Sequence, residues 1–251
     1  MAQPWRVVWI TGASTGIGAE VARQLAADGV IVAISARSAE KLKAAVDAND
    51  NLKPYPLDVT DAAAVTDCFA RIERDLGPVD LVLAAAGTYS PVSLDDFSPA
   101  PFRTMYETNF LGVVNVLTAV LPAFRRRRKG HISWIASVAG YRGLPKAAAY
   151  GPTKAALINL GESLRPELEA EGIAVSVVNP GFVKTPLTAQ NDFEMPFLME
   201  VEEAARRTIA GLASGRFEVA YPSRFVTILK IARLLPYRIY FALIRSAVLK
   251  R

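Results

Sequence analysis

Tyr150 and Lys154 stand four residues apart in Tyr-Gly-Pro-Thr-Lys, within a segment, 149–170, whose apolar spacing predicts a helix. Residues four apart share one face of a helix, so the phenol and the ammonium are expected within reach of each other. A neighbouring cation favours the phenolate. With a positively charged nicotinamide also present, the pKa of Tyr150 is expected to move from the ordinary value of about 10 toward the range that general acid–base work near neutral pH requires. The alternative is an exposed helix pair without chemistry, and the other motifs decide between the two.

A second group of residues could hold a phosphate. The strand predicted at 7–11 ends in Thr-Gly-Ala-Ser-Thr-Gly-Ile-Gly, residues 11–18, and a helix follows. Glycines permit a tight turn and a close approach of backbone to a pyrophosphate, and the helix N-terminus offers free N–H groups. The spacing Gly-x-x-x-Gly-x-Gly differs from the common dinucleotide fingerprint, and a turn of this kind can also be merely structural.

The two groups belong to one pattern. Ser137 precedes Tyr150 by 13 residues, and with Lys154 and Asn109 these residues are similar to the catalytic tetrad of the short-chain dehydrogenases/reductases. The resemblance covers residues 5 to about 220 and includes Leu-Asp-Val-Thr at 57–60 and Asn-Pro-Gly at 179–181. The chain departs from that family at 84–87, where Ala-Ala-Ala-Gly replaces the usual Asn-Asn-Ala-Gly. The departure puts local cofactor contacts in question and removes no proton-transfer group.

The resemblance implies an oxidoreductase that interconverts a carbonyl and an alcohol. Tyr150 would be the general acid in carbonyl reduction, Ser137 would hydrogen-bond the carbonyl oxygen, and Asn109 would hold a water that links Lys154 to solvent. The alternative function is a catalytically silent nucleotide-binding scaffold or sensor, which would have no physical need for this proton relay. The residues expected to bind the cofactor are Gly12, Ser14, Thr15, Gly16, Ile17, Gly18, Arg37, Asp58, Val59, Ala85, Gly87, Tyr150, Lys154, Pro180, Val183 and Thr185.

The end of the second predicted strand indicates which cofactor is used. NAD-binding sites carry an acid there that accepts from the ribose 2′-hydroxyl. This chain has Ala36 instead, and Arg37 follows with a fork of donors suited to a 2′-phosphate. The sequence therefore predicts NADP(H), with a solvated Arg37 as the alternative.

A doubly wound parallel sheet, the Rossmann fold of the α/β class, is the architecture that these motifs require. Apolar runs alternate with longer segments of helical spacing, as in βαβ units. Every motif lies at the carboxyl end of a predicted strand, where such sheets bind ligands. We expect a single catalytic domain over residues 1–223 and an extension over 224–251. Strands are predicted at 7–11, 30–36, 53–57, 81–85, 131–135 and 173–179, and helices at 18–28, 40–48, 61–76, 102–128 and 149–170.

Composition indicates a globular cytoplasmic protein. The 251 residues, 51% hydrophobic and 21% charged, can bury one large core. Cys68 is the single cysteine, and the N-terminus runs into an apolar strand without a signal peptide. His131, the single histidine, lacks partners for a metal site, and Cys68 is expected in the core. We expect no bound metal.

Charge is distributed unevenly. Seven of the 29 basic and none of the 24 acidic residues lie in 224–251, which leaves 22 basic against 24 acidic residues in 1–223. A nucleic-acid surface across the domain is therefore not expected. The basic run at 125–129 is expected to close a helix, where cations complement the C-terminal dipole.

The extension predicts two short amphipathic helices separated at Pro236. The longest charge-free run of its second half, 239–244, is too short to span a bilayer. We expect helices that lie in the interface on the inner face of a membrane, with their cations toward anionic lipid. The alternative is an arm that covers the body or a partner subunit. The side chains expected at headgroup level are Phe225, Leu229, Tyr237, Tyr240 and Phe241.

The apolar stretch at 193–199 follows Thr185, where the family carries a mobile lid over the substrate. It indicates an apolar substrate such as a lipid, sterol, retinoid or acyl chain, unless the loop only packs its own side chains on the body. The resemblance also implies a homodimer or homotetramer through the helices around 110–124 and 155–169.

Overall fold

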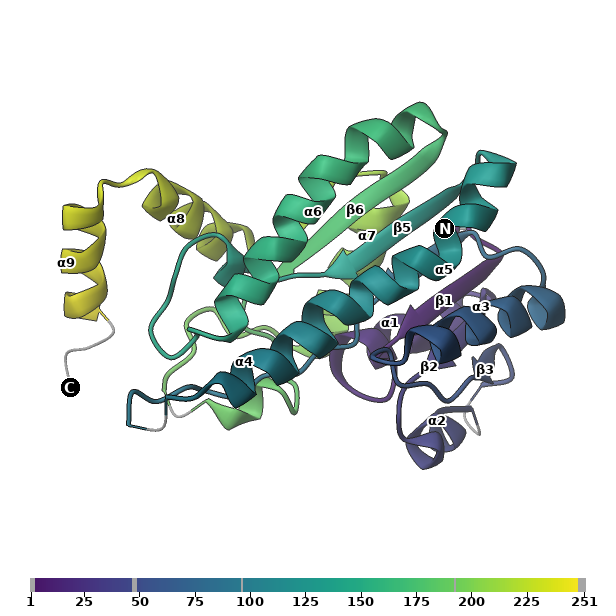
Figure 1. Ribbon diagram of the computed structural model, residues 1–251, viewed down its shortest axis with the longest axis horizontal. Helices are drawn as coiled ribbons and strands as arrows, with labels where there is room; N and C mark the ends of the chain where they lie inside the picture. The colour runs from purple at the N-terminus through teal and green to yellow at the C-terminus, as the bar shows by residue number, and fades with distance from the viewer. Residues whose placement is uncertain (1–2, 47–48, 96, 192, 248–251) are drawn as a thin grey trace.

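The computed structural model describes residues 3–46, 49–95, 97–191 and 193–247 (Figure 1). Within this part of the chain, seven parallel strands form one sheet in the order β3-β2-β1-β4-β5-β6-β7. The order reverses between β1 and β4, which opens a crevice beyond the carboxyl ends of the strands. The strands are β1 Val7–Thr11, β2 Ile31–Ser35, β3 Leu52–Pro54, β4 Leu81–Ala84, β5 Gly130–Ile135, β6 Ile173–Pro180 and β7 Glu218–Tyr221.

Six of these strands fall where the sequence predicts them. The edge strand β3 ends at Pro54, earlier than expected, because Pro54 and Pro56 have no N–H to donate to the sheet. The sequence pattern does not predict β7, a four-residue strand in which buried and half-buried residues alternate, or the helix before it, Val201–Ala213.

The helices follow the predicted pattern with one interruption. The long segment expected at 102–128 is divided by a π-helical turn, Glu107–Leu111, into α4 and α5. Asp61 begins α3 as predicted, since its carboxylate accepts from the backbone N–H of Ala64 at 2.9 Å. Residues 47 and 48, expected to end a helix, lie outside the described residues. The helices are α1 Gly16–Ala27, α2 Ala39–Val46, α3 Ala62–Leu76, α4 Pro99–Tyr106, α5 Gly112–Arg127, α6 Tyr150–Ala170, α7 Val201–Ala213, α8 Ser223–Leu234 and α9 Tyr237–Ala247.

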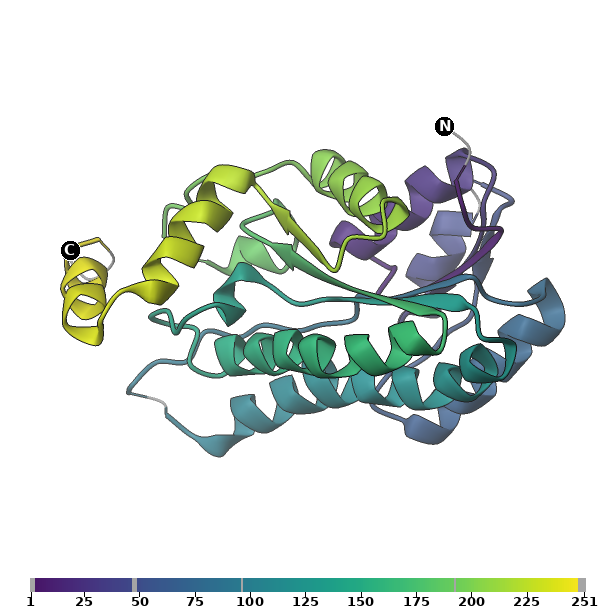
Figure 2. The same ribbon diagram turned by 90° about the horizontal axis from the view of Figure 1, so that it is seen from above.

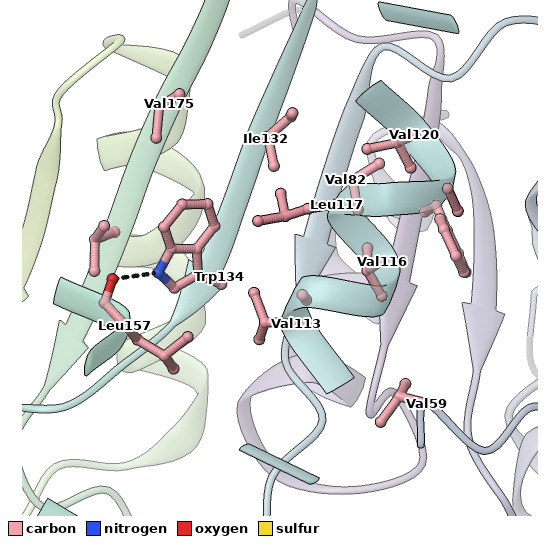
Figure 3. Close-up of a cluster of buried hydrophobic side chains, with 14 of the residues drawn as sticks. Val59, Val82, Val113, Val116, Leu117, Val120, Ile132, Trp134, Leu157 and Val175 are labelled. Atoms are coloured by element: carbon pink, nitrogen blue, oxygen red, sulfur yellow. Dashed lines mark hydrogen bonds between the residues drawn. The ribbon is translucent and has the colours of Figure 1, made fainter. Parts of the chain in front are cut away.

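Two apolar cores, one on each face of the sheet, hold the helices in place. On one face α3, α5 and α6 pack around Trp9 and Trp134, and on the other α1, α2 and α7 pack around Ile10 and Ile34. Figure 3 shows Val113, Val116 and Val120 of α5 directed at the sheet, and the indole of Trp134 donating to the carbonyl of Leu157 at 3.0 Å. Continuous apolar strands are thus buried on both sides, as parallel sheets require.

Among the described residues, one continuous helical stretch, Pro99–Arg127, is long and apolar enough to cross a membrane. Its α5 part packs against the sheet. The basic run that closes α5 behaves as predicted: Arg128 takes the left-handed conformation that ends the helix. Arg125 pairs with Glu171 and Arg127 with Glu73, each at 2.6 Å.

The last two helices, α8 and α9, follow β7 and lie beyond the carboxyl ends of the strands (Figures 1 and 2). Pro236 separates them, at the position where the sequence predicts a break. Phe225 and Val226 of α8 and Tyr240 of α9 are buried against the body. The expectation that Phe225 and Tyr240 lie at the level of lipid headgroups is therefore wrong, because protein already covers both side chains.

Candidate active site

A cavity of about 1450 Å³ occupies the crevice at the carboxyl ends of the strands. Every residue expected to bind the cofactor lines it, and Ser137 does so as well. Ligand pockets are usually about 300–1000 Å³, so this cavity has room for more than one small molecule. Asn109 is fully buried behind the cavity.

The loop between β1 and α1 forms one end of the cavity. Gly12 has φ +67°, and a Cβ there would lie 2.5 Å from the backbone nitrogen of Ala86. A Cβ at Gly18 would lie 2.7 Å from the carbonyl oxygen of Gly12. Thr15 precedes α1 without a side-chain cap, so the first N–H groups of α1 are left for a ligand. This loop, residues 11–18, forms a backbone cradle of the size and polarity that a pyrophosphate fits, and is called the phosphate cradle below.

The neighbouring end of the cavity is basic. Arg37 and Ser38 line it where β2 ends, and Lys41 reaches it from α2. Asp58 also lines the cavity, and hydrogen bonds from Thr60, with a smaller effect of Arg37, hold the pKa of its carboxyl below the ordinary value. Lys41 is not among the residues predicted for the site, although a second cation four residues after Arg37 is a signal in the sequence.

Ser137 and Tyr150 meet at the middle of the cavity. β5 ends just before Ser137, whose hydroxyl accepts from the N–H of Ala139 at 3.1 Å and lies 3.4 Å from the carbonyl of Pro180. Tyr150 begins α6 and lines the same cavity, where the Ser137 hydroxyl acts to lower the pKa of the phenol. A strand end and a helix start thus bring the two hydroxyls together.

Lys154 lies one helical turn after Tyr150 and is 3% exposed. Its Nζ donates to the carbonyl of Ile135 at 2.8 Å and lies 5.4 Å from the centroid of the Tyr150 ring. Burial lowers the pKa of Lys154 to about 7. Burial also raises the pKa of Tyr150 to about 12, although the hydrogen bond with Ser137 works in the opposite direction. In the protein alone, desolvation of the phenolate therefore dominates, and the lowering of the Tyr150 pKa expected with the charged nicotinamide stays a prediction.

Asn109 lies in the π-helical turn between α4 and α5. Its Oδ1 accepts from the N–H of Thr88 at 2.7 Å, and its Nδ2 lies 2.9 Å from the carbonyl of Thr88 and 3.3 Å from Thr153 Oγ1. A Cβ on Gly87 would lie 3.4 Å from Asn109 Oδ1 and 3.8 Å from Lys154 Nζ. The carboxamide thus fixes the loop after β4 beside the Lys154 ammonium. Single-turn π-helices often mark functional positions in this way.

Aromatic side chains surround the opposite end of the cavity. Tyr89 meets the Tyr150 ring edge to face at 5.3 Å, and Phe182 meets Phe193 of the expected lid at 5.8 Å. Tyr89 is not among the residues predicted for the site. Three lining residues from the C-terminal helices were not predicted either, because no local motif marks them: Phe225, Leu229 and Ile244.

The chain that forms this cavity is similar in sequence and in structure to known short-chain dehydrogenases and oxidoreductases. The model of the short chain dehydrogenase family matches residues 6–195. An uncharacterized oxidoreductase of Myxococcus xanthus is 37% identical over 245 residues, which cover 96% of this chain and 97% of that protein. A short-chain dehydrogenase from Streptomyces avermitilis superimposes with a TM-score of 0.84 at 26% identity, over 96% of this chain and 97% of that one. ElxO, solved with NADP bound, gives a TM-score of 0.77 at 27% identity, over 86% and 97% of the two chains.

The family match spans the sheet from β1 to β6, the phosphate cradle and the segment that carries Ser137, Tyr150 and Lys154. The alignment with the Myxococcus protein covers too much of the chain to stop before residue 224, so it includes part of the C-terminal extension. The chain belongs to the short-chain dehydrogenase family.

Proposed function

We propose that this protein is an NADP(H)-dependent oxidoreductase that interconverts a carbonyl and a secondary alcohol on an apolar substrate. The observation that carries the proposal is the convergence of Ser137, Tyr150 and Lys154 in one cavity with the phosphate cradle. A protein that only bound a nucleotide would have no need for a buried lysine beside two hydroxyls, since burying an ammonium is costly.

The bound nicotinamide supplies or takes up the hydride. Tyr150 gives its proton to the carbonyl oxygen, and Ser137 donates a hydrogen bond to the same oxygen, where negative charge develops. A phenol with a pKa of about 12 is protonated at neutral pH, as a donor must be in the direction of reduction. Lys154, with a pKa of about 7, can return a proton to Tyr150 near neutral pH. Asn109 holds the loop beside Lys154, where a water would connect the ammonium to solvent.

Three features of the basic end support NADP(H) over NAD(H). Ala36 leaves no carboxylate at the ribose, and Arg37 and Lys41 offer donors to a 2′-phosphate. The structural neighbour ElxO is solved with NADP bound.

The lining of the far end supports an apolar substrate. Tyr89, Phe182, Phe193 and Phe225 line this end of the cavity, and Tyr89 contacts the Tyr150 ring, while Lys146 and Glu194 add polar groups. A carbonyl or alcohol attached to a chain or ring system of lipid, sterol or acyl type suits these surfaces.

We also propose that α8 and α9 touch an anionic membrane surface. Large apolar side chains are exposed on both helices, and Arg224, Arg233, Arg238 and Arg245 are exposed beside them with no acid in the segment. Interfacial helices combine these two features. The exposed apolar residues of α8 and α9 are Ile228, Ile231, Leu234, Tyr237, Ile239, Phe241 and Leu243.

We also propose that the protein assembles as a homodimer or homotetramer through α5 and α6.

The test of the proposed reaction is turnover by the full chain with NADPH and NADH against a panel of ketones and aldehydes of increasing chain length, and with the matching alcohols and NADP. We expect NADPH oxidation that exceeds NADH oxidation and improves with chain length. NADPH binding without turnover of any compound in either direction would favour the scaffold function instead.

A further inference from the structure

The C-terminal helices belong to the same cavity as the catalytic side chains. Phe225 and Leu229 of α8 and Ile244 of α9 line it together with Ser137 and Tyr150. These residues lie in the extension beyond residue 223, which the sequence analysis separated from the catalytic domain. The cavity is therefore incomplete at its apolar end without α8 and α9.

Arg142 connects both helices to the loop that joins Ser137 to Tyr150. Its guanidinium donates to the carbonyls of Ala232, Arg233 and Leu235, at 3.2 Å for Arg233 and 2.9 Å for Leu235. These carbonyls lie in and just after the last turn of α8, where the helix itself pairs only that of Ala232, with the N–H of Leu235. A cation at this end also complements the helix dipole.

The same guanidinium contacts α9. It lies 3.8 Å from the centroid of the Tyr240 ring and 5.2 Å from that of Tyr237, within the range of cation–π attraction. The hydroxyl of Tyr240 donates to the carbonyl of Gly143, next to Arg142, and Tyr240 is 4% exposed. One arginine thus fixes the end of α8 and the middle of α9 to one loop.

Two further contacts hold the part of α8 from Phe225 to Lys230. The Phe225 ring stacks with Phe182 and with Phe197, in both cases at 5.7 Å, and so joins α8 to the expected lid. Lys230 pairs with Glu218 of β7, and the Glu218 carboxylate also accepts from the hydroxyl of Tyr141 at 2.5 Å. The start of α8 is therefore held independently of Arg142, while its end and α9 depend on that arginine.

We infer that α8 and α9 form the outer wall of the substrate end of the cavity, and that Arg142 is the positioning residue that holds this wall against the active site. The inference rests on the proposed function, because it assigns the wall to an apolar chain that extends from the reacting carbonyl. A short ketone that fills only the space beside Tyr150 does not reach α8 and α9. The end of the cavity proposed for NADP(H) is formed by the phosphate cradle, the end of β2 and α2.

The test compares Arg142→Ala with Arg238→Ala, a matched change at an exposed arginine of α9. For Arg142→Ala we expect the KM for a long-chain ketone to rise by about tenfold or more, the loss that follows when about two methylene groups lose their apolar contacts. The kcat for a short ketone and the Kd for NADPH should stay within about twofold of wild type, since a released wall removes no hydride or proton donor. Arg238→Ala should behave as wild type toward both ketones.

Backbone hydrogen exchange of residues 223–247 gives a second readout that needs no substrate. We expect faster exchange at the end of α8 and in α9 in Arg142→Ala, with residues 7–35 unchanged, and a smaller increase in Tyr240→Phe, which loses only the hydroxyl contact.

Unchanged exchange in Arg142→Ala would disprove the positioning role. Faster exchange with an unchanged KM for the long ketone would disprove the wall. Absence of turnover in wild type would overturn the proposed function, while the exchange data would still decide the role of Arg142. If Arg142→Ala fails to fold, Arg142→Lys, which keeps the charge without the fork, replaces it in both measurements.

Discussion

The phosphate cradle and the C-terminal helices are held by different kinds of contact. At the cradle, backbone fixes backbone, since Gly12 and Gly18 leave no space for a Cβ against the neighbouring main chain. At α8 and α9, side chains hold the structure: Arg142 at one loop, Phe225 in an aromatic stack and Lys230 in an ion pair. The first region suits a cofactor of constant shape, and the second can vary with the substrate. Substitutions at the cradle and the catalytic side chains should therefore lower turnover or cofactor binding. Substitutions that release the C-terminal helices should instead change the substrate preference.

The largest expected effect is in the body. Tyr150→Phe should lower kcat by roughly 10² to 10⁴ while NADPH still binds, because it removes the proton donor and leaves the cavity intact. Steady-state kinetics with a titration of NADPH measures both quantities. Tyr106→Phe, at an exposed tyrosine of α4, is the control, and near-normal turnover by Tyr150→Phe would remove Tyr150 from the mechanism.

Arg37→Ala should have the next largest effect, also in the body. Loss of a charged hydrogen bond to the 2′-phosphate should weaken NADP(H) binding by about 1.5–3 kcal/mol. NAD(H) has no such phosphate and should bind almost as before. Calorimetric titration with both cofactors tests this expectation, and equal losses for the two would rule out the contact. Lys41→Ala should show the same selectivity.

The contrast between the two regions also explains what the sequence could predict. The cradle, Ser137 and Tyr150 depend on local motifs at strand ends, and the structure places these residues in one cavity as the sequence implies. The lining by Phe225 and Ile244 depends on contacts between segments about 100 residues apart, such as Arg142 with Leu235, for which no local pattern exists. The direction of the Tyr150 pKa shift could not be predicted either. It depends on how much of the phenol the folded chain covers, which no local motif gives.

Lys154 should make the stability of the cofactor-free protein depend on pH. Lys154 titrates near pH 7 in the folded protein against 10.5 for an ordinary lysine, so the unfolded chain binds more protons between these values. The free energy of unfolding of the cofactor-free protein should therefore rise with pH from 7 to about 9, with each kcal/mol adding about 2–4 °C to the melting temperature. Thermal melts across this range should show a flatter profile for Lys154→Met. An equal slope in that variant would show that Lys154 is charged when folded.

The smallest expected effect concerns the C-terminal helices. The full chain should sediment with anionic vesicles at low salt and be released at high salt with mild detergent. Each of Arg238→Gln and Arg245→Gln should weaken partitioning about fivefold, since a cation near such a surface contributes about 1 kcal/mol. Turnover of a short soluble ketone should not change. If the full chain ignores the vesicles and loss of α9 alters the oligomeric state instead, the helices serve as an arm between subunits.

Transfer of deuterium from NADPH labelled at the hydride position tests the central claim most directly. With the full chain and a ketone from the panel, we predict an alcohol that carries one deuterium on its carbinol carbon, and no labelled product with Tyr150→Phe on the same timescale. Labelled NADPH that binds the wild-type protein and stays unconsumed with every ketone and aldehyde, or product whose new hydrogen on the carbinol carbon comes from solvent, would contradict hydride transfer in this cavity.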